Sequence, residues 1–149
     1  MTVIDELVRN ADSYGESFSS GDLPLPPVKR VAVVVHEGDA HVIRNAGGVI
    51  TDDEIRSLSI SQRLLGTEEI MLIHHTDCGM LTFKDDYFRQ QVQEETGVKP
   101  EWAAEAFDDL EADVHQSIAR FRASPFIPKK DQVRGFVYEV ESGRIREVT

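Results

Sequence analysis

Apolar residues along this chain occur in short unbroken runs and in spacings of three or four residues. Unbroken runs lie at Val31–Val35 and at Ile70–Ile73. Runs of this length without a polar break are typical of strands that are buried on both faces of a parallel sheet. The segment His41–Gly48 predicts a further short strand that ends in a glycine turn. We expect the strand from about Glu69 to His75 to lie at or next to the centre of the sheet.

Helical spacing of apolar residues marks four other segments, about 3–8, 52–65, 85–96 and 108–124. The first is short, so it is predicted to dock on its own domain or on a partner subunit. The second begins at a capping box, in which Thr51 and Glu54 satisfy each other's main-chain amides. Gly66 is placed to end that helix and Gly97 to end the third.

The helix predicted at 52–65 is apolar on two sides. Ile55, Leu58 and Leu65 share one side, and Ile60 and Leu64 lie roughly opposite at about 100° per residue. Its own sheet can cover only one of these sides. We therefore expect a homo-oligomer, a dimer or a tetramer, with this helix and the segment Thr2–Asn10 in the interface.

The chain ends in a predicted hairpin, because two strand-like runs within 134–148 flank Glu-Ser-Gly. Strands that alternate with helices and then close in a hairpin indicate an α/β fold. We predict three layers, with a mostly parallel β-sheet flanked by helices and a C-terminal hairpin. The length of 149 residues favours one domain over 1–149, in which 1–27 forms an N-terminal helix and an extended arm.

Composition restricts the partners and the compartment. The net charge of −11 disfavours nucleic acid and anionic membrane surfaces, which would repel the protein. One cysteine excludes an intramolecular disulfide framework and suits a reducing compartment. The first residues lack the apolar core of a signal peptide, and no apolar run approaches the ~18 residues of a membrane span. We expect a cytoplasmic protein without membrane contact.

Candidate chemistry follows directly after the run Ile70–Ile73. His75 and Cys78 stand three residues apart, and Gly79 allows the backbone to turn away from them. Both are zinc-type ligands, and a zinc site needs three or four. The alternative is that Cys78 is a small buried apolar residue and that His75 is only hydrogen-bonded. These two positions are the predicted metal ligands, and no catalytic residue is assigned.

Four stretches of the chain resemble the β-class carbonic anhydrases, in particular the small actinobacterial type. They are EGDAHVIRNAGG at 37–48, DDEIRSLSISQRLLGT at 52–67, LIHHTDCGM at 72–80 and RGFVYEVESGRIREV at 134–148. The resemblance implies an enzyme that hydrates CO2 reversibly to bicarbonate and that forms dimers or higher oligomers. It implies Zn2+ bound by Cys, His and Cys, with His75 and Cys78 as the second and third ligands.

The family's first zinc ligand belongs to a C-x-D-x-R motif after the first strand, and its Asp and Arg pair beside the metal. In this chain Val31–Val35 runs directly into HEGD, without that motif. Only about five residues lie between Val35 and His41, whereas a parallel crossover needs a dozen or more. Three explanations stay open. The sequence omits natural residues between Val35 and Glu37, or they are truly deleted, or His36 is a substitute ligand.

Two other functions compete with CO2 hydration. One is hydrolysis of carbonyl sulfide or carbon disulfide by the same fold and zinc chemistry, and the other is a metal-free pseudoenzyme that serves as a binding or structural subunit. Near the predicted ligands, His74 and Asp77 either accept a hydrogen bond or orient His75, or they are solvated loop residues. Trp102 is interpreted as core or interface packing, and His41 and His115 as structural residues.

Overall fold

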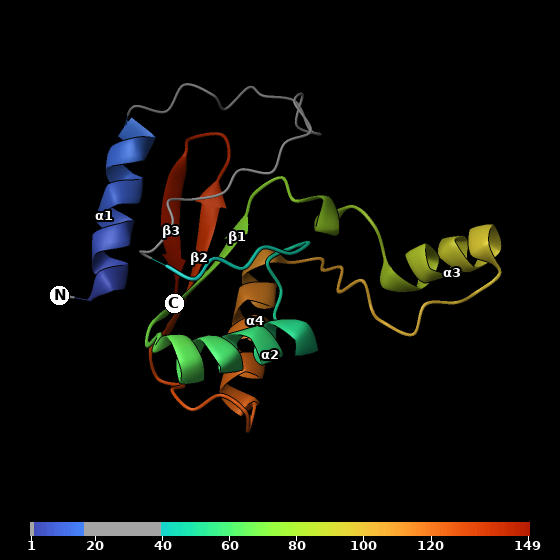
Figure 1. The fold of residues 1–149 in the computed structure, drawn as a ribbon. Coiled ribbons are helices and arrows are strands. Elements are labelled where there is room, and N and C mark those ends of the chain that lie inside the picture. The colour runs from blue at the N-terminus through green and yellow to red at the C-terminus, as the bar shows by residue number, and fades with distance from the viewer. Residues whose placement is uncertain (1, 17–39) are drawn as a thin grey trace.

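The computed structural model of the protein describes residues 2–16 and 40–149 (Figure 1). Its sheet has the order β1-β2-β3, with β1 at Ile70–His75, β2 at Val133–Glu139 and β3 at Arg144–Val148. β1 pairs with β2 in parallel, with Leu72 opposite Gly135, and β2 pairs with β3 in an antiparallel hairpin. The predicted C-terminal hairpin is confirmed, as is the α/β fold class.

Helices lie on both faces of this sheet. On one face, α4 (Leu110–Ala123) comes so close to Gly135 that an added Cβ would lie 2.3 Å from the side chain of Val114. The next residue on the strand, Phe136, points to the other face because strand side chains alternate. On that other face α1 (Val3–Glu16) packs against β3, and Arg134 bonds Asp5 of α1 at 2.8 Å. The molecule therefore has the predicted three layers.

The burial of β1 differs from the prediction. Leu72 and His74 are buried towards α4, whereas the side chain of Ile73 between them is 44% exposed. The prediction that both faces of this strand are buried was wrong. The reason is that α4 packs on β1 but α1 packs on β3, so the second face of β1 is uncovered in the described part of the chain.

Within the described residues, β1 is an outer strand that lies next to the central strand β2, whereas the prediction placed it at or next to the centre. The predicted strand Val31–Val35 lies outside the described residues. The strand predicted at His41–Gly48 does not form, and only its glycine turn is confirmed, with φ of 79° at Gly47 and 73° at Gly48. The backbone there crosses over the end of β1, because an added Cβ on Gly48 would lie 2.7 Å from the carbonyl oxygen of Ile73.

The predicted helix at 52–65 begins as α2 (Asp52–Ile60) and continues as one π-helical turn, η1 (Ser61–Leu65). The capping box is present, with the main-chain N–H of Thr51 donating to Glu54 at 3.0 Å. Gly66 ends the helix in the left-handed conformation, with φ of 73°. Local sequence signals therefore set both ends of this helix.

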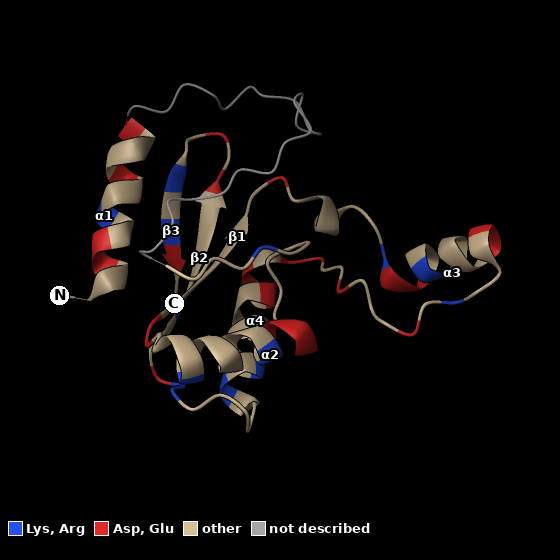
Figure 2. Cartoon of the chain, viewed as in Figure 1, with Lys and Arg blue, Asp and Glu red and all other residues tan. Residues whose placement is uncertain are grey.

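The next two helices also follow their signals. α3 spans Asp85–Thr96 and ends at Gly97, whose φ is 80°. α4 begins at Leu110 and is capped by Asp109, which accepts from the N–H of Ala112 at 2.9 Å. Acidic side chains gather in the first turns of α2 and α3 (Figure 2), where they complement the positive end of the helix dipole.

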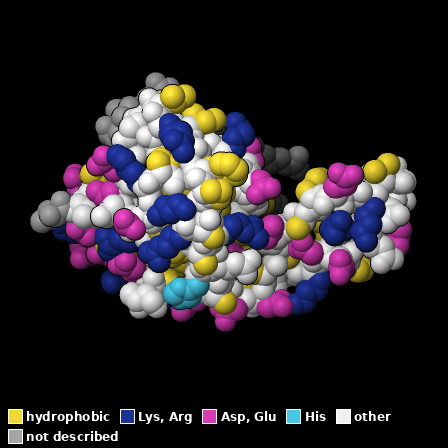
Figure 3. Space-filling view, turned by 90° about the horizontal axis from the view of Figure 1, so that it is seen from below, with side chains coloured by type: hydrophobic (Ala, Val, Ile, Leu, Met, Phe, Trp, Pro, Cys, Tyr) yellow, Lys and Arg dark blue, Asp and Glu magenta, His cyan; other side chains and the backbone are white. Residues whose placement is uncertain are grey.

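Residues 82–106 form an arm that stands away from the rest of the molecule, as Figures 1 and 3 show. We call this segment the arm, and the sheet with α2 and α4 the body. The arm contains α3, none of whose residues is buried, and its return segment. Of the helices that the structure describes, none is both long and apolar enough to cross a membrane.

Candidate metal centre

His75 is the last residue of β1, and its side chain is partly buried. Its Nδ1 lies 2.7 Å from the carbonyl oxygen of Thr76. A carbonyl oxygen can only accept, so Nδ1 carries a proton, and in the neutral ring Nε2 then has the free lone pair. This is the tautomer in which a histidine binds a metal through Nε2 while its other nitrogen is held by a hydrogen bond.

The loop after His75 is tied to the hairpin. The N–H of Thr76 donates to the carbonyl oxygen of Tyr138 at 2.9 Å, and its hydroxyl donates to Glu141 at 2.8 Å. The same hydroxyl accepts from the N–H of Val140 at 3.0 Å. The pKa of Glu141 is held below its usual value, chiefly by its own main-chain N–H and then by Thr76. These bonds fix the backbone between the two predicted ligands to the sheet.

Cys78 is buried, with 5% of its surface exposed. It belongs to a small apolar cluster with Val49, Met80 and Phe107, next to the short helix η2 (Gly79–Leu81). The carbonyl oxygen of Met80 also accepts from the N–H of Phe107 at 3.2 Å. The thiol therefore lies among apolar side chains from three parts of the chain, which keep bulk water away from it.

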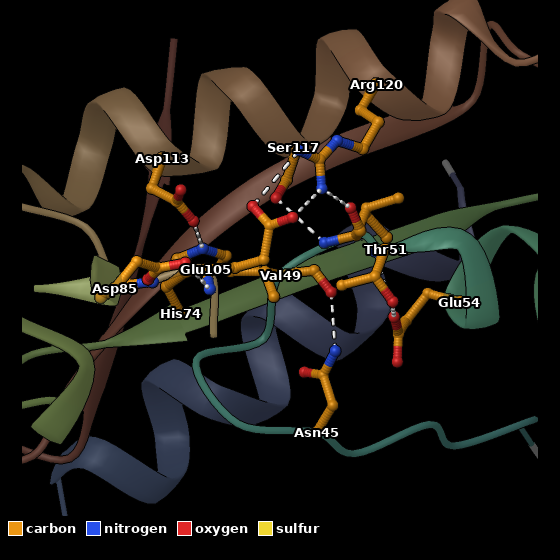
Figure 4. Close-up of polar contacts among 12 residues, drawn as sticks. Asn45, Val49, Thr51, Glu54, His74, Asp85, Glu105, Asp113, Ser117 and Arg120 are labelled. Carbon is orange, nitrogen blue, oxygen red and sulfur yellow. Dashed lines mark hydrogen bonds and ion pairs between the residues drawn. The ribbon is translucent and has the colours of Figure 1, made fainter. Parts of the chain in front are cut away.

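His74 points to the face of the sheet opposite His75. It is 1% exposed, and its Nε2 lies 2.7 Å from a carboxylate oxygen of Asp113 on α4 (Figure 4). Its Nδ1 has no hydrogen-bond partner in the described part of the chain. The interpretation of His74 as a solvated loop residue was wrong. Asp77, by contrast, is exposed and has a positive φ of 52°.

A second polar group lies beside His74 in Figure 4 and was not predicted. The guanidinium of Arg120 donates to Glu105 at 3.2 Å and 3.3 Å and to the carbonyl oxygen of Ile50 at 2.6 Å. Ser117 accepts from the N–H of Ile50 at 3.2 Å. The available signal was the i, i+4 spacing of Asp113 and Ser117 beside the apolar stripe of α4, where both residues are buried.

Tyr138 is the β2 residue that pairs with His75 in the parallel register. Its pKa is raised, first by burial and then by the charge and hydrogen bond of Tyr14 on α1. The end of α1 is close to this part of the sheet, since an added Cβ on Gly15 would lie 2.9 Å from the side chain of Arg144. The N-terminal helix therefore reaches the strand end that carries His75.

The donors of the described residues fit zinc in type but not in number. His75 offers Nε2 and Cys78 offers sulfur, but this part of the chain holds no group of three or more His, Cys, Asp or Glu side chains that could bind a metal ion. A zinc site needs three or four ligands. That His75 and Cys78 share one metal ion stays a prediction, and the sequence stretch at issue between Val35 and Glu37 lies outside the described residues.

The sequence model of the carbonic anhydrase family matches residues 28–145. Beta-carbonic anhydrase 1 of Mycobacterium tuberculosis is 50% identical over 163 aligned positions, covering 100% of this chain and 99% of that protein. A carbon disulfide hydrolase of Acidithiobacillus thiooxidans is 32% identical, covering 84% of this chain and 72% of that protein. Among solved structures, a carbonic anhydrase from Streptococcus mutans superposes with a TM-score of 0.72 at 37% identity, covering 100% and 99% of the two chains.

The mycobacterial alignment also bears on the missing segment. It spans 163 positions, whereas this chain has 149 residues, so at least 14 positions of the relative face a gap in this chain. The relative therefore carries additional residues, as expected if this chain lacks the stretch with the first zinc ligand.

Proposed function

Because the chain belongs to the carbonic anhydrase family, we propose that it hydrates CO2 reversibly to bicarbonate with zinc, which His75 and Cys78 help to bind. The observation that carries the proposal is the 50% identity to a β-carbonic anhydrase across the whole chain. The tautomer of His75, with Nδ1 donating to Thr76, supports its role as a ligand. Zinc, when bound, supplies a nucleophile at neutral pH by lowering the pKa of a water to about 7.

In this proposal the residues of the chain orient the imidazole of His75 and exclude water from the surroundings of Cys78. The carbonyl oxygen of Thr76 holds the imidazole of His75 by a bond of 2.7 Å, so the ring keeps one tautomer and one direction. Cys78 is enclosed by Val49, Met80 and Phe107, which keep its surroundings apolar. A catalytic zinc site has three protein ligands, so the proposal needs one ligand beyond His75 and Cys78, and the described residues hold no group of three.

Metal analysis together with CO2 hydration tests this function. We expect about one zinc per chain, and we expect Cys78→Ala to lose both the zinc and the hydration rate measured by stopped-flow with a pH indicator. His115→Ala is the matched control, because His115 is exposed on α4. A purified protein without zinc, and without hydration when zinc is added, would identify the chain as a metal-free pseudoenzyme and end the proposal.

Hydrolysis of carbon disulfide is a second candidate, favoured by the similarity to proteins named carbon disulfide hydrolase at 32% to 36% identity. The reaction consumes one carbon disulfide and two waters, and it releases one CO2 and two molecules of hydrogen sulfide. Release of sulfide from carbon disulfide or from carbonyl sulfide by the zinc-loaded protein, at a rate above its CO2 hydration, would assign this activity in place of the first.

We also propose that the protein is a homodimer or a homotetramer. The side chains of Ile60, Leu64 and Leu65 on α2 and η1 are 41%, 78% and 63% exposed. Val3 and Leu7 on α1 are 60% and 42% exposed. Figure 3 shows apolar side chains among the charged ones on the lower face of the body. Analytical ultracentrifugation that finds a stable monomer at micromolar concentration would contradict the proposal.

A further inference from the structure

A pocket lies between the arm and the body, on the outer side of the cluster that surrounds Cys78. Its cavity volume is about 440 Å³, which is within the size range of small-molecule sites. Val49 and Met80 form its inner wall and belong to the cluster of Cys78. Aromatic side chains of the arm also line it, so the lining comes from both the body and the arm.

The pocket contains a carboxylate that is almost fully buried. Glu54 is 8% exposed and lines the pocket. It accepts hydrogen bonds from the N–H and the hydroxyl of Thr51, which are both neutral groups, and both bonds go to Oε2 (Figure 4). Glu54 lies in the first turn of α2, where the N–H of Thr51 and the positive end of the helix dipole stabilise its carboxylate. The carboxylate gives this end of the pocket a negative charge, which favours a cationic ligand over an anionic one. The other carboxylate of the pocket, Glu105, is already paired with Arg120.

Three aromatic rings line the same pocket, and each ring lies close to the next. The ring centroids of Phe83 and Phe88 are 5.4 Å apart, and those of Phe88 and Trp102 are 6.3 Å apart. Trp102 is 59% exposed, so of its two predicted roles core packing was wrong and interface packing stays a prediction. The faces of aromatic rings attract cations, most strongly when the cation is an ammonium group stripped of water.

We propose that this pocket binds a small organic cation, an ammonium group on an apolar body. The charge would lie by Glu54, and the apolar body would contact Trp102, Phe88 and Met80. A neutral ligand of the same shape would lack the attraction to the carboxylate and to the ring faces, and bicarbonate would be repelled by the carboxylate. The site is thus separate in charge and in ligand class from the predicted ligands His75 and Cys78, and it does not depend on the proposed activity.

Benzylammonium and benzyl alcohol form a matched pair of probes, since they have nearly the same shape but only the first is charged. Titrations are done at constant ionic strength by calorimetry and by the fluorescence of Trp102, the only tryptophan of the chain. We expect benzylammonium to bind about tenfold more tightly than benzyl alcohol, as a desolvated cation contact implies. Equal affinities, or no binding of either probe at millimolar concentration, would overturn the proposal.

Glu54→Gln tests the carboxylate without removing the helix cap, because glutamine also serves in a capping box. We expect the variant to bind benzylammonium about tenfold more weakly and benzyl alcohol unchanged. Glu94→Gln is the matched control, with the same change of charge at an exposed position of α3. Equal effects of the two variants would refute the site. Affinity that falls as the protein concentration rises would mean that a second copy fills the pocket, and would also refute it.

Discussion

The body and the arm of this protein are held together by different interactions. In the body, Val114 and Phe121 of α4 and Phe136 of β2 are 0% exposed, and Leu72 of the distant strand β1 is 5% exposed. In the arm, no residue of α3 is buried, and polar bonds to the backbone hold the chain. Asp85 accepts from the N–H groups of Glu105 and Ala106, and Arg89 donates twice to the carbonyl oxygen of Pro100.

This contrast indicates where the fold is rigid and where it is adaptable. Burial of apolar area supplies most of the folding free energy, so the body should unfold as a cooperative unit. The arm has few buried apolar contacts, and its opening should cost less free energy than global unfolding. Both predicted metal ligands lie at the end of a body strand or next to it, whereas the proposed cation pocket needs both regions.

The largest effect is expected from the buried pair in the body. Asp113→Ala leaves both nitrogens of His74 without a partner in a site that is 1% exposed. We expect the free energy of unfolding, measured in urea by circular dichroism, to fall by about 3 kcal/mol. Asp109→Ala is the comparison, because it removes only an exposed cap bond and should cost about 1 kcal/mol. Equal losses of unfolding free energy in the two variants would show that the buried pair stabilises the fold no more than an exposed cap bond does.

A smaller loss is expected from overpacking between the sheet and α4. In Gly135→Ala the new Cβ would lie 2.3 Å from the side chain of Val114 and 2.8 Å from that of Ile118. Because α4 has to move to make room, we expect the free energy of unfolding, measured in urea, to fall by about 2 kcal/mol. Gly79→Ala adds the same atom where nothing lies within 4 Å, so its stability should stay within about 0.5 kcal/mol. A neutral Gly135→Ala would contradict the close packing.

In the arm we expect a local effect. Asp85→Ala frees the N–H groups of Glu105 and Ala106, which should loosen the arm by about 1 kcal/mol. Trp102 is in the arm, so its fluorescence should change at a lower urea concentration than the circular dichroism signal. Asp86→Ala, at the exposed neighbouring position, should leave the two transitions together. Coincident transitions in both variants would mean that the arm and the body unfold as one unit.

The smallest effect concerns the attachment of α1 to the sheet. The pKa of Asp5 is lowered from 3.8 to about 2, chiefly by the main-chain N–H of Thr2 and then by Arg134. A carboxylate whose pKa is depressed in the folded state adds stability at pH values above its unfolded pKa. For Asp5 this added stability is lost as the pH falls from about 4 through about 2. Stability measured across this range should decline less steeply in Asp5→Asn. Identical slopes for the two proteins would rule out this contribution.

Much of the helical structure could be predicted because its signals are local. The capping box at Thr51, the glycines that follow α2–η1 and α3, and the turn before β3 act within about four residues along the chain. The choice of His75 and Cys78 as candidate ligands also needs only residue type and spacing. Their meeting at one metal ion depends on the fold around them, and it stays a prediction.

The incorrect predictions concern contacts between distant segments. An apolar run such as Ile70–Ile73 predicts burial on both faces, but which faces are covered depends on where α1 and α4 pack. The run His41–Gly48 has strand-like residues but finds no strand to pair with in the described part of the chain. Strand formation needs a neighbour, and the neighbour is not encoded locally.

The ends of α2–η1 and α3, the hairpin, the α/β class and the residue types at the predicted metal centre follow from the amino-acid sequence alone, because each depends on neighbours along the chain. Other features depend on the folded chain: His74 bonds Asp113 across 39 residues, Arg120 bonds Ile50 across 70, and Glu54 shares a pocket with Trp102. These contacts arise when packing of the sheet and helices brings distant side chains together. No periodicity or spacing in the chain specifies such distances.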